Sequence, residues 1–360
     1  MRLKLEKRQE PSMLMLVLTP ILSVVATMLI GIVVFDAIGI DGAQAVKDIF
    51  LTPILASYKW QDVAVKAAPL IIIALGLSVG NRANVWNIGA EGQYILGAIC
   101  AAAVGLSTGS GGFLVILAMI LAGMAGGTAW SALPAVLKLR FRVNEILSSL
   151  MLTYVALQVL NYLVSGPWKD PNGRNFPATA PLLPEQSLPI LVPGTTIHLG
   201  VAVALILPFV FWGIMSKSVF GYQIRVVGAA PHAAAHGGFE ARQTIWASML
   251  IGGGMAGLAG ALEFTGILHK IDLGFPSGYG FTAIIVSLLG RLHPIGCLIA
   301  GFVLAVTSVG GQLAKTTVHI PDSTAGIFQA MMLFLILASD ILVRYRVKLV
   351  RSPKAARAGE

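Results

Sequence analysis

Charge is scarce in this chain. Only 11% of its 360 residues are Asp, Glu, Lys or Arg, whereas 56% are hydrophobic and the mean hydropathy is +0.82. Soluble globular domains have about 25% charged residues, so the composition excludes an ordinary water-soluble domain. Cysteine is also scarce. Cys100 and Cys297 stand singly in apolar segments, which favours neither a disulfide framework nor a metal site.

Long apolar runs replace the missing charge. Stretches of about 20 residues with few charges have the length that crosses a hydrocarbon core of ~30 Å. We therefore predict an all-α polytopic membrane protein with about ten transmembrane helices. The predicted spans are 13–35, 62–80, 88–107, 112–137, 145–165, 197–215, 244–264, 281–291, 294–313 and 324–343. The segment 281–291 is too short to cross unless 275–280 joins it, so a half-helix or re-entrant piece is the alternative.

The distribution of positive charge predicts the topology. With the N-terminus inside, cytoplasmic loops and tails contain 18 Lys and Arg, against 6 on the outer side. This bias follows the positive-inside rule and predicts that both termini are cytoplasmic. It also accounts for the net charge of +9 without nucleic-acid binding, because the charges are scattered beside anionic lipid. We divide the chain into a cytoplasmic tail, 1–12, a transmembrane domain, 13–345, and a basic cytoplasmic tail, 346–360.

A polar, glycine-rich stretch lies where one membrane helix should begin. Residues 81–97 contain Asn87, Gly89, Glu91 and Gln93. An unsatisfied peptide group or carboxylate in the bilayer core costs several kcal/mol, so these residues should avoid lipid. We expect them near a transport pathway or a helix-packing seam. Glu91 could contact substrate, accept a gating hydrogen bond, or serve as a first-turn acid favoured by the helix dipole.

Two loops are longer than a connection requires. The outer loop, 166–196, is rich in proline and turn residues; it could dock an external partner or form a cap without function. In the cytoplasmic loop, 216–243, Pro231 suits the first turn of a helix, alanines continue it and Gly237 ends it. We predict a helix of about two turns there. Such a short helix is marginal alone and needs support from its own protein or a partner.

Several motifs lack the context that their chemistry needs. The pattern G-x-G-x-x-G at 252–257 lies in an apolar span without a preceding strand, so it is no dinucleotide site. Gly253, Gly257 and Gly260 instead suit close helix packing. The stretch 310–316 lacks a required P-loop glycine. The six histidines fall in different loops and span ends, no nucleophile–base arrangement appears, and we predict neither catalytic residues nor a metal site.

Four stretches resemble the ABC importer permeases for nucleosides and simple sugars, and the resemblance extends over about residues 60–345. They are NIGAEGQ at 87–93 with Pro69 upstream, RVVG at 225–228 continuing through Pro231 to Gly238, AGLAGA at 256–261, and GYGFTAIIVSLLGR at 278–291. Ala90 and Gln93 in the first stretch, with the longer first third of the chain, make it similar to the longer of two paired permease subunits. Phe239 departs from the pattern, since the family more often has an aliphatic residue there.

The resemblance implies a type II ABC importer-like fold and a function. The chain would form half of a translocation pathway for nucleosides or simple sugars in the bacterial cytoplasmic (inner) membrane. Its partners would be a second homologous permease, an ABC ATPase that holds ATP and Mg²⁺, and an external substrate-binding lipoprotein. No cofactor is expected on this chain. The residues assigned to the pathway are Asn87, Gly89, Glu91, Gln93, Gly280 and Phe281; those assigned to ATPase coupling are Gly228, Pro231, Ala233, Ala234 and Gly237.

Two other classes of function fit part of the pattern. A secondary carrier driven by an ion gradient also uses broken helices, but the charges here lie near span ends and form no proton relay. A membrane scaffold without transport activity would use the short cytoplasmic helix only for docking. ATP dependence of uptake separates the first two classes, and absence of uptake would favour the third.

Overall fold

A computed structural model describes residues 2–7, 13–173, 176–318 and 324–350. The remaining parts of the predicted tails, residues 1, 8–12 and 351–360, lie outside the described residues. The chain divides into two compact units, Thr52–Gly310 and a second unit made of Met1–Leu51 with Gly311–Glu360. The boundary between them falls inside α13, which runs from Pro294 to Thr317.

All ten predicted spans lie on helices. They are α1 (Met13–Ala37), α4 (Trp60–Arg82), α5 (Ala90–Ser107), α6 (Phe113–Phe141), α7 (Glu145–Ser165), α8 (Leu199–Lys217), α11 (Ala241–Glu263), α12 (Tyr279–Leu289), α13 (Pro294–Thr317) and α14 (Thr324–Arg344). Among the described residues, eight helices are long and apolar enough to cross a membrane, and α12 and the 326–335 part of α14 are shorter. The prediction of a polytopic α-helical membrane protein is therefore confirmed.

The structure resolves the ambiguity at 281–291. Helix α12 has 11 residues, which span roughly 16 Å at 1.5 Å per residue. A hydrocarbon core is ~30 Å thick, so α12 is a half-helix. The chain before it does not extend it, because the π-helical turn η4 (Phe264–Leu268) ends at His269 and residues 273–278 are not helical.

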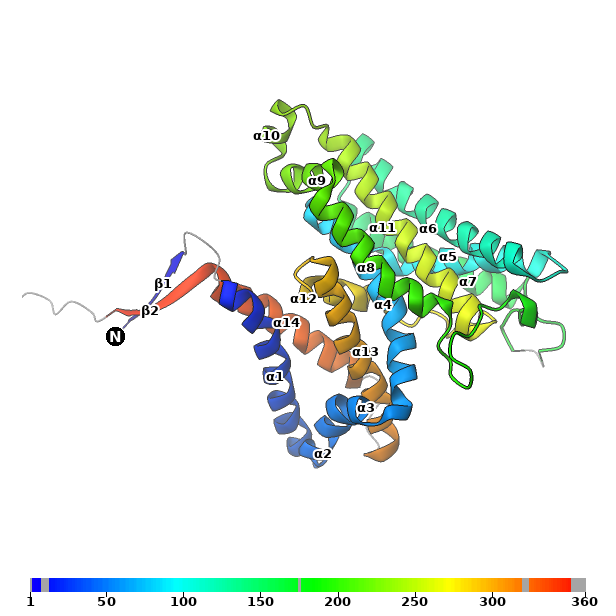
Figure 1. The fold of residues 1–360 in the computed structure, drawn as a ribbon, viewed down its shortest axis with the longest axis horizontal. Helices are drawn as coiled ribbons and strands as arrows, with labels where there is room; N and C mark the ends of the chain where they lie inside the picture. The colour runs from blue at the N-terminus through cyan, green and yellow to red at the C-terminus, as the bar shows by residue number, and fades with distance from the viewer. Residues whose placement is uncertain (1, 8–12, 174–175, 319–323, 351–360) are drawn as a thin grey trace, which may run out of the picture. The chain divides into compact units, whose positions relative to one another are not determined.

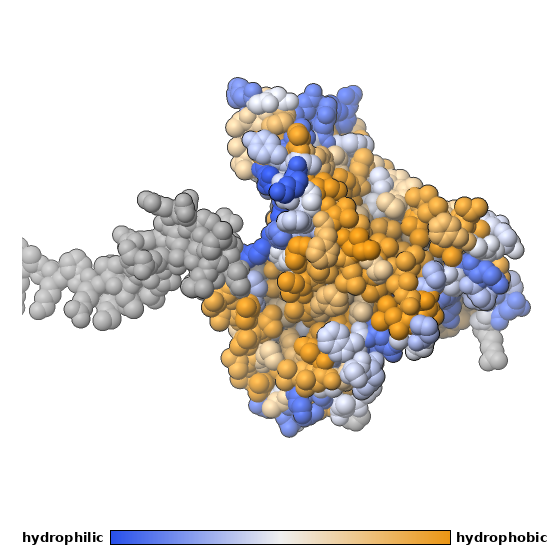
Figure 2. Space-filling model, in the orientation of Figure 1, coloured by the Kyte–Doolittle hydropathy of each residue, from blue (hydrophilic) through white to orange (hydrophobic). Residues whose placement is uncertain are grey.

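In the Thr52–Gly310 unit, burial separates central from peripheral helices. In the apolar stretch of α4, 89% of the residues are buried, and in that of α11, 72%. In the apolar stretches of α6 and α7, only 22% of the residues are buried. A helix that is apolar all round belongs in a core, and α4 fits this rule. Figure 2 shows an apolar surface over the sides of this unit. The surface is more polar around α9 and α10, which Figure 1 labels in the same orientation.

Small residues set the closest helix approach in this unit. A β-carbon at Gly257 on α11 would overlap the carbonyl of Gly123 on α6, and one at Gly253 would overlap Ser131. A β-carbon at Gly260 would overlap the carbonyl of Tyr94 on α5. Gly253 and Gly257, like Gly123 and Gly127, are four residues apart and face the partner helix, as in small-xxx-small packing.

Short elements complete the Thr52–Gly310 unit. They are α3 (Thr52–Leu55), η2 (Ser57–Lys59), η3 (Pro184–Gln186), α9 (Val219–Ala229) and α10 (Pro231–His236). Helix α9 is an amphipathic helix that the sequence analysis missed. Its buried face is formed by residues at helical spacing, Gly221, Ile224 and Val227. The Ser218 hydroxyl caps the start of the helix by accepting the Gly221 N–H at 3.1 Å.

The outer loop, 166–196, is tied to the rest of its unit. The Gln186 side chain is buried, and its Nε2 lies 2.9–3.1 Å from the carbonyl oxygens of Gly105, Thr108 and Ser110, which share its two N–H donors at the end of α5. Its neighbour Leu188 donates its N–H to the carbonyl of Thr265 at 2.9 Å. The loop is therefore a packed cap over one end of the helices. Whether it also docks a partner stays a prediction.

The second unit pairs the two ends of the chain. Helices α1 and α14 meet through Phe328, whose ring lies 5.5 Å from that of Phe35 and 5.9 Å from that of Phe50. The unit also contains α2 (Gly42–Val46), η1 (Lys47–Leu51) and an antiparallel ribbon of β1 (Arg2–Lys7) and β2 (Tyr345–Val350). The all-α prediction missed this ribbon, although Leu3 and Leu5 alternate with charged residues at strand spacing.

Candidate functional site

The polar stretch before α5 folds into a network that is satisfied by the protein itself. Asn87 and Gln93 exchange hydrogen bonds through their amides, with Asn87 Nδ2 donating to Gln93 Oε1 at 2.8 Å and Gln93 Nε2 donating to Asn87 Oδ1 at 3.1 Å. The Gly89 N–H also donates to Asn87 Oδ1, at 3.1 Å. Both amide side chains are buried. Because buried polar groups need partners, this arrangement allows a polar turn to lie among apolar helices.

Glu91 connects this turn to the half-helix. Its carboxylate accepts the N–H of Gly278 at 2.9 Å and the N–H of Gly280 at 2.6 Å, while only 2% of the residue is exposed. These amides belong to the first turn of α12, whose N-cap Gly278 itself has no capping side chain. A carboxylate there satisfies free N–H groups and interacts favourably with the helix dipole.

Glycines make this contact possible. Gly278 has φ +74°, in the left-handed region that glycine adopts without strain. A β-carbon at Gly280 would overlap the Glu91 backbone. On the other side of α5, a β-carbon at Gly89 would lie 2.6 Å from the Ser149 carbonyl oxygen of α7. Five of the six predicted pathway residues are therefore packed or hydrogen-bonded within the unit. The sixth, Phe281, is 41% exposed.

Aromatic rings lie beside the carboxylate, and sequence analysis did not identify them. Tyr94 is fully buried, with its ring stacked on Phe275 at 5.0 Å and edge-on to Tyr279 at 5.9 Å. The Tyr94 hydroxyl has no hydrogen-bond partner among the described residues. Tyr94 lies one helical turn after Ala90, but Phe275 is distant in sequence, so only the fold could bring them together.

The predicted coupling segment begins with α9, which packs directly on the turn between α4 and α5. A β-carbon at Gly228 would overlap the carbonyl of Arg82, the last residue of α4. Nearby, Ile224 belongs to one buried apolar cluster with Val85 and Met249. Thus the backbone of α9 lies against the same turn that leads into Asn87 and Glu91.

The rest of the segment forms the predicted short helix, α10. Pro231 occupies its first position and Gly237 its C-cap. Ala233 is exposed, whereas Ala234 is fully buried and its carbonyl accepts the Phe239 N–H at 3.0 Å. Ala234 therefore packs inward against its own chain, and Ala233 belongs to the outward face.

His198 and His269 lie at the opposite end of the unit from α10. His198 is buried, and its Nδ1 accepts the Gly200 N–H at 3.1 Å at the start of α8. Burial, followed by the nearby His269, lowers the pKa of His198 to about 4, so the imidazole is neutral at pH 7. The described residues contain no group of three or more His, Cys, Asp or Glu side chains that could hold a metal ion.

These features define a class of protein. Long apolar helices, a half-helix capped by a buried carboxylate, and a short exposed helix between two spans are the parts of a membrane transport subunit. No solved structure matches this chain.

The chain belongs to the family described as branched-chain amino acid transport system / permease component, which matches residues 60–337. It is 33% identical over 339 residues to the glucose ABC transporter permease protein TsgB13 of Haloferax volcanii, covering 91% of this chain and 89% of that protein. It is 33% identical over 282 residues to the guanosine ABC transporter permease protein NupP of Bacillus subtilis, covering 77% and 80%. A second guanosine permease of that organism, NupQ, is 30% identical over 266 residues, covering 69% and 81%.

The protein is thus a permease subunit of an ABC importer, as the sequence resemblance predicted. It is a multi-pass membrane subunit and not itself an enzyme, because the ATPase of such a system is a separate subunit. Nothing among the matches supports a secondary carrier driven by an ion gradient. The individual roles assigned to site residues stay predictions.

Proposed function

We propose that this permease imports a nucleoside or a simple sugar as half of a two-permease pathway. The similar proteins are named for glucose and for guanosine, which share a polyhydroxylated sugar ring. The pairing of NupP with NupQ in one organism supports a second, homologous permease beside this chain. An external lipoprotein would deliver the substrate, and a partner ATPase would hold ATP and Mg²⁺.

The proposed orientation follows the charge bias. The end of the unit that contains α10 is cytoplasmic, and both termini lie on that side of the bacterial inner membrane. The ATPase would then contact α10 through its exposed face, which includes Pro231 and Ala233. Ala234 and Gly237 would act indirectly, by holding the helix in place.

One observation carries the coupling proposal: the contact of Gly228 with Arg82. Movement of α10 would be transmitted through α9 to the Arg82 carbonyl and so to the turn that precedes Asn87. Glu91 would pass the displacement to the start of α12, because its carboxylate holds the first amides of that half-helix. Binding energy from ATP-driven closure of the ATPases would thereby shift the permease between outward-open and inward-open states.

In this mechanism the polar residues frame the pathway and support α12. Asn87, Gly89, Glu91 and Gln93 form the support, and Gly280 lets α12 approach it. Phe281 is the pathway residue with an exposed side chain, and it would face the substrate. The buried Tyr94 hydroxyl is a further polar group that α12 would uncover if it moved away from α5.

The test of function is copurification followed by uptake. The tagged chain is isolated from gently solubilised native membranes and its partners are identified by mass spectrometry. We expect an ATPase, a second permease and a lipoprotein, and ATP-dependent uptake of a labelled nucleoside or sugar by the reconstituted complex. Recovery of the intact chain alone, with uptake that follows an ion gradient, would contradict the proposal.

The coupling route has its own test, Gly228→Ala. The added methyl group overlaps the Arg82 carbonyl, and overpacking of this kind costs about 1–3 kcal/mol. We expect uptake to fall at least tenfold while the ATPase still copurifies. Gly213→Ala on α8 is the matched control, because a β-carbon there meets nothing within 4 Å. Equal uptake by the two variants would show that α9 does not transmit the movement.

A further inference from the structure

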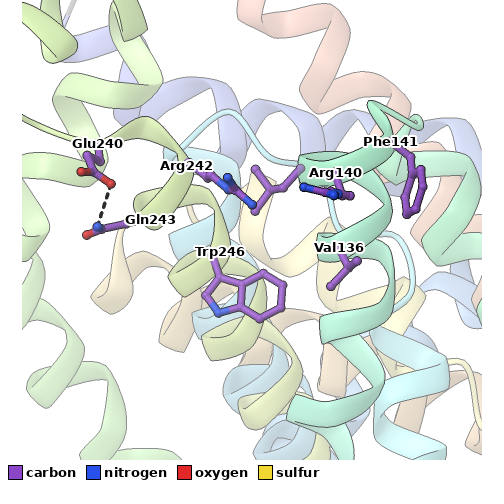
Figure 3. Close-up of a pocket in the computed structure, with 8 residues that line it drawn as sticks. Val136, Arg140, Phe141, Glu240, Arg242, Gln243 and Trp246 are labelled. Atoms are coloured by element: carbon purple, nitrogen blue, oxygen red, sulfur yellow. Dashed lines mark hydrogen bonds between the residues drawn. The ribbon is translucent and has the colours of Figure 1, made fainter.

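A groove lies between α6 and α11 at the end of the unit that contains α10. Its volume is about 740 Å³ (Figure 3). The residues that line it are Val136, Leu139, Arg140, Phe141, Glu240, Arg242, Gln243 and Trp246. None of them belongs to the pathway or coupling residues described above.

The packing of the two helices explains why a groove opens here. From Gly123 to Ser131 on α6, glycine and serine hold the backbone against Gly253 and Gly257 of α11. Beyond that seam the facing positions carry large side chains, among them Val136 and Trp246. The helices cannot approach as closely there, and space remains between them.

Two arginines converge on this space. Figure 3 shows the Arg140 and Arg242 side chains extending toward one another from α6 and α11. Each residue is exposed and lies one position inside the end of its helix. Neither guanidinium forms an ion pair within the described part of the chain, whereas the neighbouring Lys138 pairs with Glu145. Glu240 also lines the groove, where its carboxylate accepts a hydrogen bond from the neutral Gln243 amide at 2.7 Å. The lining thus contains two guanidinium groups and one carboxylate. The groove therefore has a net positive charge.

The walls below the arginines are apolar. Val136 lies four residues before Arg140 and Trp246 four residues after Arg242, so both lie one helical turn farther along their helices. Val136 is 42% exposed and Leu133, one turn before it on α6, is 44% exposed. Tryptophan is typical of the membrane–water interface, where its ring meets both lipid chains and head groups.

We infer that this groove binds an anionic phospholipid, with its phosphate between Arg140 and Arg242 and one acyl chain along Val136 and Leu133. Paired arginines match a phosphate, and basic grooves between membrane helices bind anionic head groups. A free phosphate would use the arginines but leave the apolar walls uncovered. In the orientation proposed above, the lipid belongs to the cytoplasmic leaflet, yet the inference does not depend on the transported substrate.

Fluorescence quenching tests the inference on the full-length chain. The purified protein is reconstituted in phosphatidylcholine vesicles containing increasing fractions of brominated phosphatidylglycerol or, in parallel, brominated phosphatidylcholine. Bromine quenches a nearby indole, and subtraction of the Trp246→Phe signal isolates the contribution of Trp246. We expect Trp246 to be half-quenched at a much lower fraction of phosphatidylglycerol than of phosphatidylcholine.

Charge-matched variants identify the binding residues. Arg140→Gln with Arg242→Gln should raise the half-quenching fraction of phosphatidylglycerol by about thirtyfold, from the typical contribution of a basic residue at an anionic surface. Arg142→Gln with Lys217→Gln removes the same charge from exposed residues outside the groove and should leave it unchanged.

Three results would overturn the inference. Equal quenching by the two lipids would show no anionic preference, and equal effects of the two double variants would show only a diffuse surface potential. Full competition by millimolar glycerol phosphate would assign the groove to a soluble anion. In the first case, a crosslink from Arg140→Cys to the copurified ATPase would assign the groove to a protein interface instead.

Discussion

Replacement of Glu91 by glutamine tests the link between the polar turn and the half-helix. The substitution keeps the shape of the side chain but exchanges one carboxylate oxygen for an N–H₂ donor. In the structure both oxygens accept backbone amides, from Gly278 at 2.9 Å and from Gly280 at 2.6 Å. Glutamine can accept one of these bonds. Its amide nitrogen then faces the other N–H, which loses its partner.

The magnitude follows from these two bonds. Hydrogen bonds to charged groups contribute about 1.5–3 kcal/mol each, and a buried donor left without a partner costs about 1–3 kcal/mol. Because Glu91 is only 2% exposed, water cannot readily replace the lost bond. We therefore expect the attachment of α12 to weaken by about 2–3 kcal/mol, a factor of roughly 30 to 160 in an equilibrium constant.

The assay is ATP-dependent uptake by the assembled transporter in vesicles, with hydrogen exchange measured at Gly278 and Gly280. Uptake should fall at least tenfold, and both amides should exchange faster. Glu185→Gln is the control, since it makes the same chemical change at an exposed position of the outer loop. Normal uptake together with unchanged exchange would refute the assignment of Glu91 as the attachment point of α12.

Three further outcomes follow from the structure. Ala234→Asp should destabilise α10, because the Ala234 side chain is fully buried. Ala233→Asp, at an exposed position, should keep the fold but uncouple ATP hydrolysis from uptake. Similar melting temperatures for the two variants would contradict this prediction. Gln186→Ala removes the two amide N–H donors that the carbonyls at the end of α5 share, and it should lower the free energy of unfolding by about 2–3 kcal/mol in a denaturation experiment. An unchanged value would be inconsistent with the cap. Burial, with a smaller contribution from the nearby His269, lowers the pKa of His198 to about 4 in the folded protein. As the pH falls below about 6.5, His198 is therefore protonated in the unfolded chain while it stays neutral in the folded protein. The free energy of unfolding should therefore decline by up to about 3 kcal/mol between pH 6.5 and pH 4. His198→Asn, which can still cap α8, should make the free energy of unfolding less dependent on pH in this range. An unchanged pH dependence would reject the role of His198.

The membrane helices were predictable because apolar length alone identifies them. The predicted span 145–165 matches α7, and 294–313 falls within α13. Composition could not decide whether 281–291 spans the membrane, since a half-helix and a short span have the same apolar residues. Helix α9 was missed because its amphipathic pattern lies in a loop that glycine and proline seemed to dominate.

The sequence predicts that the polar stretch needs buried partners, but it does not predict which residues those partners are. A polar stretch in an apolar setting pointed to Asn87 and Glu91, since such residues need partners. The partners of Glu91 lie 187 and 189 residues away, and no local pattern indicates a contact over that separation. The inward direction of Ala234 was equally hidden, because one alanine among three in a short helix has no distinguishing spacing.

The connection between η4 and α12 behaves as a spacer of defined length. Its beginning is held where the Ile271 N–H donates to Thr179 Oγ1 at 3.0 Å, and its end is held where Gly280 meets Glu91. An extended residue spans about 3.3 Å, so deletion of one residue would pull both amides out of hydrogen-bond reach of the carboxylate. Insertions and deletions should therefore be excluded from 272–279 as this chain diverges.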